Sequence, residues 1–376
     1  MGSRGRLAEL FRFLRDPHLV ARFQRLCGVR GGFSGASRRP LRRNSLTDDA
    51  GQEFVAENRF LYYLFTLGAE LGNEPFYLSF FPFLLWNVDA LVSRRLIMVW
   101  VCVMYLGQCT KDVLRWSRPA SPPVVKVEMF YDCEYGMPST HAMSGTAIPF
   151  ALFFLTRGRW QYSLSLGLAL AVCWCLLVCV SRIYMGMHSL LDVMAGVLYS
   201  ALILLFLLPA LDAVDEFVLT GAYAPAAAAA LPAGLGLLSF ALDGWSTSRA
   251  DTAQILGSGA GVALGSRVNR LLGLLPDPPP ERLPLAPPPL AAAGPAAAAA
   301  ALRWGAGVLV LVATRALMKA LVAPALRRVW AVPEREVRRA RRGARLELPY
   351  RYVVYAAVGF NVLFLAPLLF RFLRLS

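Results

Sequence analysis

Long apolar runs separated by short polar stretches dominate this sequence. The runs recur at about 95–110, 142–156, 162–181, 189–210, 218–242, 296–314 and 352–370. A helix needs roughly 17–25 apolar residues to cross a bilayer, and continuous runs of this kind satisfy their backbone groups internally as helices. Strands of a membrane barrel would instead alternate over about ten residues. The pattern therefore predicts an all-α fold, a polytopic bundle of membrane helices.

Two further stretches bring the expected number of crossings to about eight to ten. Residues 60–88 are apolar and aromatic, but a polar segment at 70–75 makes them either one kinked helix or two. Residues 254–273 alternate glycine with other small residues until Arg267. This second pattern favours a re-entrant or poorly lipid-exposed helix.

Composition agrees with a membrane protein, since 57% of the residues are hydrophobic and only 17% are charged. The net charge of +15 comes largely from two basic blocks. Residues 1–50 hold eleven Arg and four acids, and residues 327–351 hold nine Arg and three acids. Neither block interleaves aromatic residues in a nucleic-acid-binding module, so we expect no nucleic-acid partner. The positive-inside rule instead predicts that both blocks are cytosolic.

The chain divides into a basic, mostly disordered tail at 1–58 and a multi-pass membrane domain at 59–376. No apolar block in the tail is long enough for a signal peptide. An alternative for its first part is a short helix on an anionic membrane surface, because apolar residues fall there at helical spacing: Leu7, Leu10, Phe11 and Leu14. Ser45 follows two arginines, as in sites of basophilic kinases.

Three cations lie at the ends of apolar runs. Lys111 closes the first run, and Arg118 follows about two helical turns later, before a proline. Arg182 lies at the end of the run 162–181. Because 142–156 and 162–181 are consecutive crossings, they return the chain to its starting side, and all three cations reach one membrane face.

Hydroxyl groups and histidines accompany these cations. Ser139 and Thr140 precede an apolar run, so they occupy a helix N-terminus, where free N–H groups attract anions. The chain has three histidines, and His141 and His188 both lie in these polar segments. Asp192 shares a helix face with His188 and can accept from one imidazole nitrogen, leaving the other as a nucleophile. Any one motif is compatible with an ordinary helix end, but together they predict a phosphate pocket with a nucleophile and an acid.

The motifs resemble the signatures of the type-2 phosphatidate phosphatase and haloperoxidase superfamily, which run Lys-x6-Arg-Pro, Pro-Ser-Gly-His and Ser-Arg-x5-His-x3-Asp. The first and third are matched in full by Lys111, Arg118, Pro119, Ser181, Arg182, His188 and Asp192. The second departs at Thr140, which replaces glycine and permits fewer backbone conformations.

The Pro-Ser-Thr-His variant is similar to that of the sphingosine-1-phosphate phosphatases, as are the segments 105–112, 143–146 and 182–188. The similarity extends through 243–249 and 348–352. It implies a multi-pass enzyme of the endoplasmic reticulum, with a six-helix phosphatase core, that takes sphingoid base phosphates from the bilayer. It also implies hydrolysis with no metal or other cofactor.

The resemblance also assigns roles. His188, oriented by Asp192, attacks phosphorus to form a phosphohistidine, while His141 protonates the leaving alkoxide and then activates water. The phosphate oxygens are surrounded by Lys111, Arg118, Ser139, Thr140 and Arg182.

Other functions stay open on the sequence alone. A broad lipid phosphate phosphatase is the nearest, although its third signature usually has paired histidines and Met187 stands here. A sugar phosphatase would carry similar signatures. A transporter or a non-catalytic scaffold belongs to a different class, but the charges lie at helix ends and both histidines are present. No sequence feature indicates the oligomeric state.

Family resemblance places the site in the lumen, opposite the two basic blocks. That arrangement requires residues 60–88 to cross the membrane twice. It also requires 254–273 not to cross, since otherwise the block 327–351 would share the side of His188.

Overall fold

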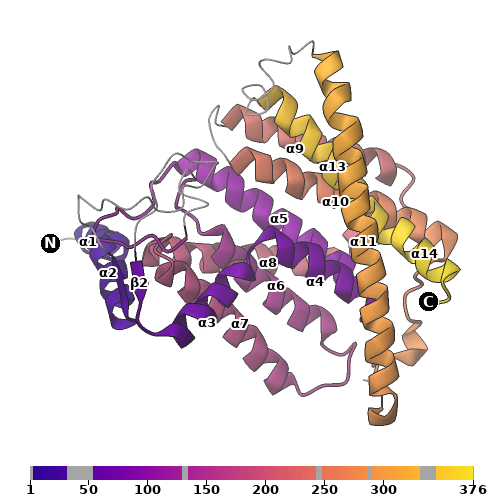
Figure 1. Cartoon of the computed structure of the whole chain (residues 1–376), viewed down its shortest axis with the longest axis horizontal. Coiled ribbons are helices and arrows are strands. Elements are labelled where there is room, and N and C mark those ends of the chain that lie inside the picture. The colour runs from indigo at the N-terminus through magenta and orange to yellow at the C-terminus, as the bar shows by residue number, and fades with distance from the viewer. Residues whose placement is uncertain are drawn as a thin grey trace.

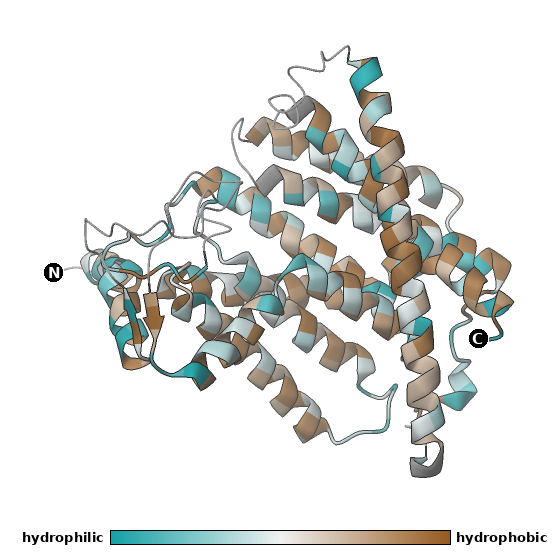
Figure 2. Cartoon of the chain, in the orientation of Figure 1, coloured by the Kyte–Doolittle hydropathy of each residue, from teal (hydrophilic) through white to brown (hydrophobic). Residues whose placement is uncertain are grey.

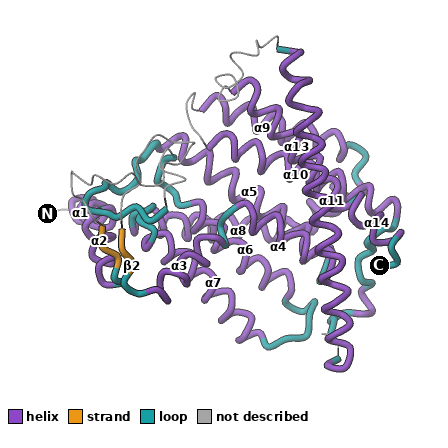
Figure 3. The backbone as a smooth tube through the Cα atoms, in the orientation of Figure 1, coloured by secondary structure: helices purple, strands orange, loops and turns teal. Residues whose placement is uncertain are grey.

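The protein is a helical bundle, seen in a computed structural model that describes residues 3–31, 54–128, 134–242, 248–286, 289–330 and 344–375. In the described part, the strands are β1 (Val29–Gly31) and β2 (Phe54–Ala56), which pair antiparallel beside the N-terminal helices. Figure 3 shows how completely helices make up the rest. The all-α prediction is therefore confirmed.

The bundle is built from helices that run back and forth between its two ends (Figure 1). They are α3 (Arg59–Glu70), α4 (Glu74–Asn87), α5 (Ala90–Leu114), α6 (Thr140–Thr156), α7 (Leu164–Tyr184), α8 (Leu190–Thr220), α9 (Ala224–Leu242), α10 (Ser248–Leu272), α11 (Leu290–Val329), α13 (Ala344–Leu363) and α14 (Leu365–Phe372). A short 3-10 turn, η1 (Pro280–Arg282), precedes α11.

Within the described residues, six helical segments are long and apolar enough to cross a membrane. They are α5, α7, α8, α9, most of α11, and the segment 346–372 that contains α14. The α3–α4 pair, α6 and α10 run between the same two ends but are shorter or more polar. Figure 2 shows hydrophobic residues along the helices and hydrophilic ones gathered in the loops. The chain is therefore a multi-pass membrane protein.

The core lies where α4, α5 and α6 meet. Tyr77 and Phe81 on α4 pack against Trp100 on α5, with ring centroids 4.9 and 5.6 Å from that of the tryptophan. Tyr77 also donates from its hydroxyl to Ser144 on α6 at 2.8 Å. Aromatic contacts of this kind fix the three helices in one register.

Helix α10 is held in the bundle by glycines that face α13. A side chain at Gly257, Gly261 or Gly265 would meet backbone atoms of α13. Small residues let two membrane helices approach closely. The prediction of a poorly lipid-exposed helix at 254–273 is confirmed, and the re-entrant alternative is wrong, because the segment belongs to one continuous helix.

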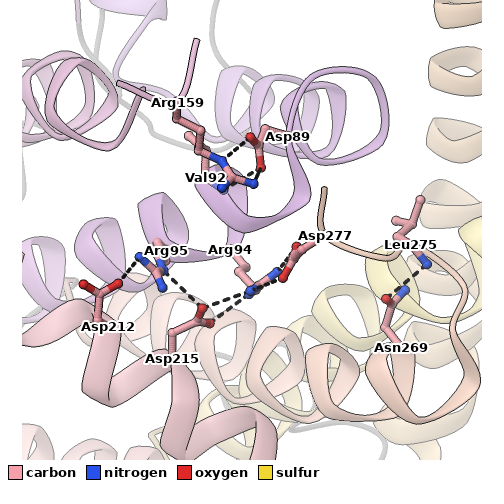
Figure 4. Close-up of polar contacts among 10 residues, drawn as sticks. All are labelled: Asp89, Val92, Arg94, Arg95, Arg159, Asp212, Asp215, Asn269, Leu275 and Asp277. Atoms are coloured by element: carbon pink, nitrogen blue, oxygen red, sulfur yellow. Dashed lines mark hydrogen bonds and ion pairs between the residues drawn. The ribbon is translucent and has the colours of Figure 1, made fainter. Parts of the chain in front are cut away.

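One end of the bundle is closed by ion pairs, which Figure 4 draws. Buried Arg94 donates to Asp215 on α8 at 2.8 Å and to Asp277 at 2.7 Å. Arg95 also donates to Asp215, at 3.1 Å. We call this the ion-paired end, and the opposite end, formed by residues 111–128, 134–140 and 182–189, the motif end.

The stretch 60–88 crosses the bundle once, as two helices. α3 lies against the motif end, where the rings of Phe65 and Tyr184 are 4.8 Å apart. α4 ends beside Asp89, which pairs with Arg159 near the ion-paired end. The double crossing that a lumenal site opposite the basic blocks required is therefore wrong.

Helix α10 also passes from one end to the other. It begins at the motif end, where Asp251 and Lys111 line the same cavity. It finishes near Asn269, which shares a second cavity with Arg94. The non-spanning interpretation of 254–273 is therefore wrong, and the start of α13 returns to the motif end.

The described part of the N-terminal tail is folded, where the sequence predicted mostly disorder. Helices α1 (Ser3–Arg15) and α2 (Pro17–Leu26) form, so the first part is helical, while its place on a membrane surface stays a prediction. Gln24 is buried and donates to the carbonyls of Val125 and Tyr184, at 2.7 and 2.9 Å. These bonds attach the tail to the motif end. Ser45 lies outside the described residues.

We predict that tags at the N-terminus, in 119–127 and in 330–343 report one compartment. A tag in the loop 157–163 should report the other, because that loop lies beside the ion-paired end. Glycosylation of inserted acceptor sites and protease protection measure this. Tags at the N-terminus and in 119–127 that report opposite compartments would contradict the fold.

Candidate active site

The first cation is placed by the end of α5. Lys111 lies in the last turn and is 1% exposed. Arg115 ends the helix in the left-handed conformation, with φ of 53°, and redirects the chain toward Arg118. The Lys111 ammonium donates to Thr140 Oγ1 at 3.1 Å and to Glu134 at 3.0 Å. Lys111 is thus fixed between two other segments of the site.

Thr140 begins α6 without backbone strain. Among the described residues other than glycine, a positive φ occurs at Arg115 and Arg374 alone. Space for the Thr140 methyl group comes from Gly107 on α5, where an added Cβ would lie 3.1 Å from it. Threonine permits fewer backbone conformations than glycine, but the conformation of Thr140 is one that threonine adopts readily.

Ser139 has a structural place in this site. It is fully buried and caps α6, its hydroxyl accepting from the Ala142 N–H at 3.4 Å. Its side chain is not among those that line the cavity described below. The contact of this hydroxyl with phosphate that the sequence suggested stays a prediction.

His188 follows a turn that only glycine fits. Gly186 has φ of +73°, and a Cβ there would collide with the Val125 carbonyl. Helix α8 then starts with a capping box, in which Asp192 accepts from the Ser189 N–H at 2.8 Å and donates its own N–H to the Ser189 hydroxyl. The carboxylate of Asp192 is thus engaged with the helix start.

The imidazole of His188 lies within hydrogen-bond distance of Arg118 but not of Asp192. Its Nε2 lies 3.2 Å from an Arg118 nitrogen. Arginine only donates, so Nε2 accepts and the proton is on Nδ1. Nδ1 is 3.9 Å from Asp192 Oδ2, too far for a hydrogen bond. The predicted orientation of His188 by Asp192 is therefore present as proximity only, because the carboxylate caps α8.

Burial lowers the pKa of His188 well below its usual value, and Arg118 and Arg182 lower it further. The group therefore stays neutral at neutral pH. A neutral imidazole keeps the lone pair that a nucleophile needs.

Two glutamates that sequence reasoning missed pair with the cations. Glu128 accepts from Arg182 at 2.8 Å, and Glu134 lies 3.6 Å from Arg118 as well as 3.0 Å from Lys111. Burial raises the pKa of Glu134, but the nearby cations outweigh it and hold the value below the usual range. Both acids lie in a loop without periodicity, so no local signal marked them.

Arg182 keeps unused hydrogen-bonding capacity. It is fully buried, and in the described part of the chain its Nε and second terminal nitrogen have no partner. A buried donor without an acceptor is costly, so this side is suited to an incoming anion.

His141 is held by the break between α3 and α4. Its Nε2 lies 3.0 Å from the Asn73 side-chain oxygen. A side chain at Gly72 would overlap the imidazole ring. The sequence showed this break as a polar interruption, but it gave no indication that the break positions a histidine.

Most of these groups meet at one cavity of about 180 Å³, although Arg182 is not among the residues that line it. The residues Lys111, Arg118, Thr140, His141 and His188 line its polar part. The cavity continues between apolar side chains that include Phe81, Ile97, Trp100, Met104, Val262 and Leu311. One cavity therefore joins an anion site to a hydrophobic arm.

Within the ranges that the structure describes, no group of three or more His, Cys, Asp or Glu residues is placed to hold a metal ion.

Comparison with known proteins gives consistent matches. Residues 83–214 match the model of the PAP2 superfamily. The chain is 48% identical to Sphingosine-1-phosphate phosphatase 1 of Mus musculus over 99% of both chains. It is 39% identical to Sphingosine-1-phosphate phosphatase 2 of Homo sapiens over 98% of this chain and 100% of that one. Lipid phosphate phosphatase delta of Arabidopsis thaliana matches at 33% identity over 39% of this chain and 37% of its own. No solved structure matches.

We predict that Gly72→Ala lowers kcat by about tenfold or more, because the new methyl group displaces His141. Steady-state kinetics on purified protein measure this. Gly305→Ala is the matched control, since a Cβ there meets open space. Equal kcat values for the two variants would show that the break does not position the ring.

We predict that Glu134→Gln binds inorganic phosphate about tenfold more tightly, because an ionised carboxylate no longer competes for Lys111 and Arg118. Product inhibition by phosphate measures the change. Glu347→Gln removes a glutamate that pairs with Arg351 instead and should leave the inhibition constant unaltered. Weaker phosphate binding in Glu134→Gln would refute the competition.

Proposed function

This chain belongs to the sphingosine-1-phosphate phosphatase family, within the PAP2 superfamily, and we propose that it hydrolyses sphingosine 1-phosphate and related sphingoid base phosphates. The products are the free base and inorganic phosphate. The observation that carries the proposal is the cavity in which a cationic, histidine-bearing end opens into an apolar arm. A lipid phosphate has an anionic head that fits the cationic end and an alkyl chain that fits the apolar arm.

The apolar arm separates this substrate class from sugar phosphates. Its walls include Trp100, Met104 and Leu311. A sugar would leave its hydroxyl groups without partners against such side chains, which is unfavourable. An alkyl chain gains free energy by the same contact.

Phosphate binding begins the proposed reaction. The substrate dianion displaces Glu134 from Lys111 and Arg118 and takes up the free donors of Arg182. Charge-assisted bonds from these three cations stabilise the equatorial oxygens as charge develops.

Nucleophilic attack follows from the tautomer of His188. The Nε2 lone pair attacks phosphorus in line, the bond to the ester oxygen breaks, and a phosphohistidine forms. The proton on Nδ1 remains, and the nearby Asp192 carboxylate stabilises the positive charge that the ring acquires.

His141 supplies the proton that the reaction needs. When the substrate dianion binds, His141 takes up a second proton from solvent and becomes an imidazolium. Its Nε2–H, which now points at Asn73, is donated to the departing alkoxide. The resulting neutral imidazole then takes a proton from water as the water attacks the phosphohistidine, which releases phosphate. No step requires a metal ion.

Family resemblance supports the endoplasmic reticulum membrane as the location and the lumen as the side of the site. In the fold, the described parts of both basic blocks lie at the motif end, so they share the compartment of the site. The positive-inside rule opposes a lumenal position for such segments. The compartment reported by tags in 119–127 and 330–343 therefore decides between a lumenal site, which the resemblance supports, and a cytosolic site, which the charge distribution supports.

We predict that the purified protein releases phosphate from sphingosine 1-phosphate, and that His188→Ala and Arg182→Ala reduce turnover by at least about 10³-fold. Both variants should still insert into membranes. His18→Ala is the control, because that histidine lies in the N-terminal tail. Turnover retained by His188→Ala would remove the nucleophile assignment.

The same assay separates the alternatives. Comparable rates on phosphatidate would indicate a broad lipid phosphate phosphatase, and a preference for glucose 6-phosphate a sugar phosphatase. No release from any substrate would leave a transporter or scaffold. Activity should persist in excess chelator, and a loss that magnesium restores would contradict a metal-independent reaction.

A further inference from the structure

Three carboxylates line the same cavity as the histidines: Glu74, Glu134 and Asp251. Two of them are neutralised by close partners. Glu134 pairs with Lys111 at 3.0 Å, and Glu74 pairs with Arg315 at 3.0 Å while accepting from the Tyr355 hydroxyl. Their charges are therefore already compensated within the protein.

Asp251 lacks a comparable partner. Among the described residues its one ion pair is with Arg351, at 3.8 Å. That guanidinium instead bonds Glu347, at 2.6 and 3.0 Å. Asp251 is thus the least compensated acid of the cavity.

The side chain of Asp251 is partly accessible. The residue lies in the first turn of α10, which is packed inside the bundle, yet 38% of its side-chain surface is accessible. The residue is also part of the cavity wall. An accessible carboxylate in this cavity, without a close partner, favours a ligand that brings its own positive charge.

Asp251 also lies near the phosphate-binding groups, since it lines the same cavity as Glu134 and Lys111. A cation bound to it would therefore be close to the phosphate. In a sphingoid base phosphate, the ammonium is on the carbon next to the one that carries the phosphate ester. Phosphatidate and lysophosphatidate have no ammonium group.

We propose that Asp251 binds the ammonium group of the substrate and thereby selects sphingoid base phosphates over glycerol-based lipid phosphates. The proposal rests on the function proposed above. It assigns Asp251 to specificity, not to bond cleavage.

The test compares sphingosine 1-phosphate with lysophosphatidate of similar chain length. Asp251→Asn should lower kcat/KM for sphingosine 1-phosphate by about 10- to 100-fold, the value of one charge-assisted bond. The rate on lysophosphatidate should change by less than about threefold, because this lipid has no ammonium group and makes no bond to Asp251 that the substitution could remove. Asp212→Asn, at an exposed carboxylate of the ion-paired end, is the control and should alter neither.

An equal loss on both substrates, or no loss on sphingosine 1-phosphate, overturns the proposal while the phosphatase function stands. A wild-type protein that releases phosphate from neither substrate overturns the proposed function itself, and this inference with it.

A measurement on the wild type covers the case in which Asp251→Asn does not fold. O-Phosphoethanolamine and propyl phosphate are nearly isosteric, and only the first carries an ammonium. O-Phosphoethanolamine should inhibit at about tenfold lower concentration. Asp251→Glu should preserve that preference, because it keeps the charge. Equal inhibition by the two compounds overturns the proposal.

Discussion

Three cations brought to one point inside an apolar bundle are the constraint on which this structure depends. Lys111 and Arg182 have almost no exposed surface, and a charge in such a place is stable only with partners. Glu128 and Glu134 supply two negative charges against the three positive ones of Lys111, Arg118 and Arg182. A phosphate dianion can take over this role, so the same arrangement that keeps the resting protein stable also prepares it for its substrate.

Much of the site could be predicted from the sequence because its groups lie at helix ends. Consecutive crossings return to the same side, so Lys111, Arg118, His141, His188 and Arg182 had to meet if the runs were helices. The structure brings them together as expected. Ser139 and Asp192 were harder to place, because a capping residue and a phosphate ligand have the same local sequence. Only the three-dimensional contacts show that both are engaged with helix starts.

The site residues that sequence analysis missed lie in segments without a periodic pattern. Glu128 and Glu134 come from a loop, where spacing carries no information about contacts. The prediction that 60–88 crosses twice and 254–273 not at all failed for a related reason. Hydropathy reports the length of the run 60–88 but not that the chain breaks at Gly72 to make room for an imidazole. In 254–273, the glycines indicated close packing, while the polar residues at the end concealed a full-length helix.

The contact between Arg118 and His188 has a consequence for the idle enzyme. The electron pair that would attack phosphorus is already shared with a guanidinium, so an empty site has little reactivity toward stray electrophiles. In the proposed mechanism, an arriving phosphoryl group draws the guanidinium to its oxygens and uncovers the imidazole at the same moment. The substrate itself then switches on the reactivity of the histidine.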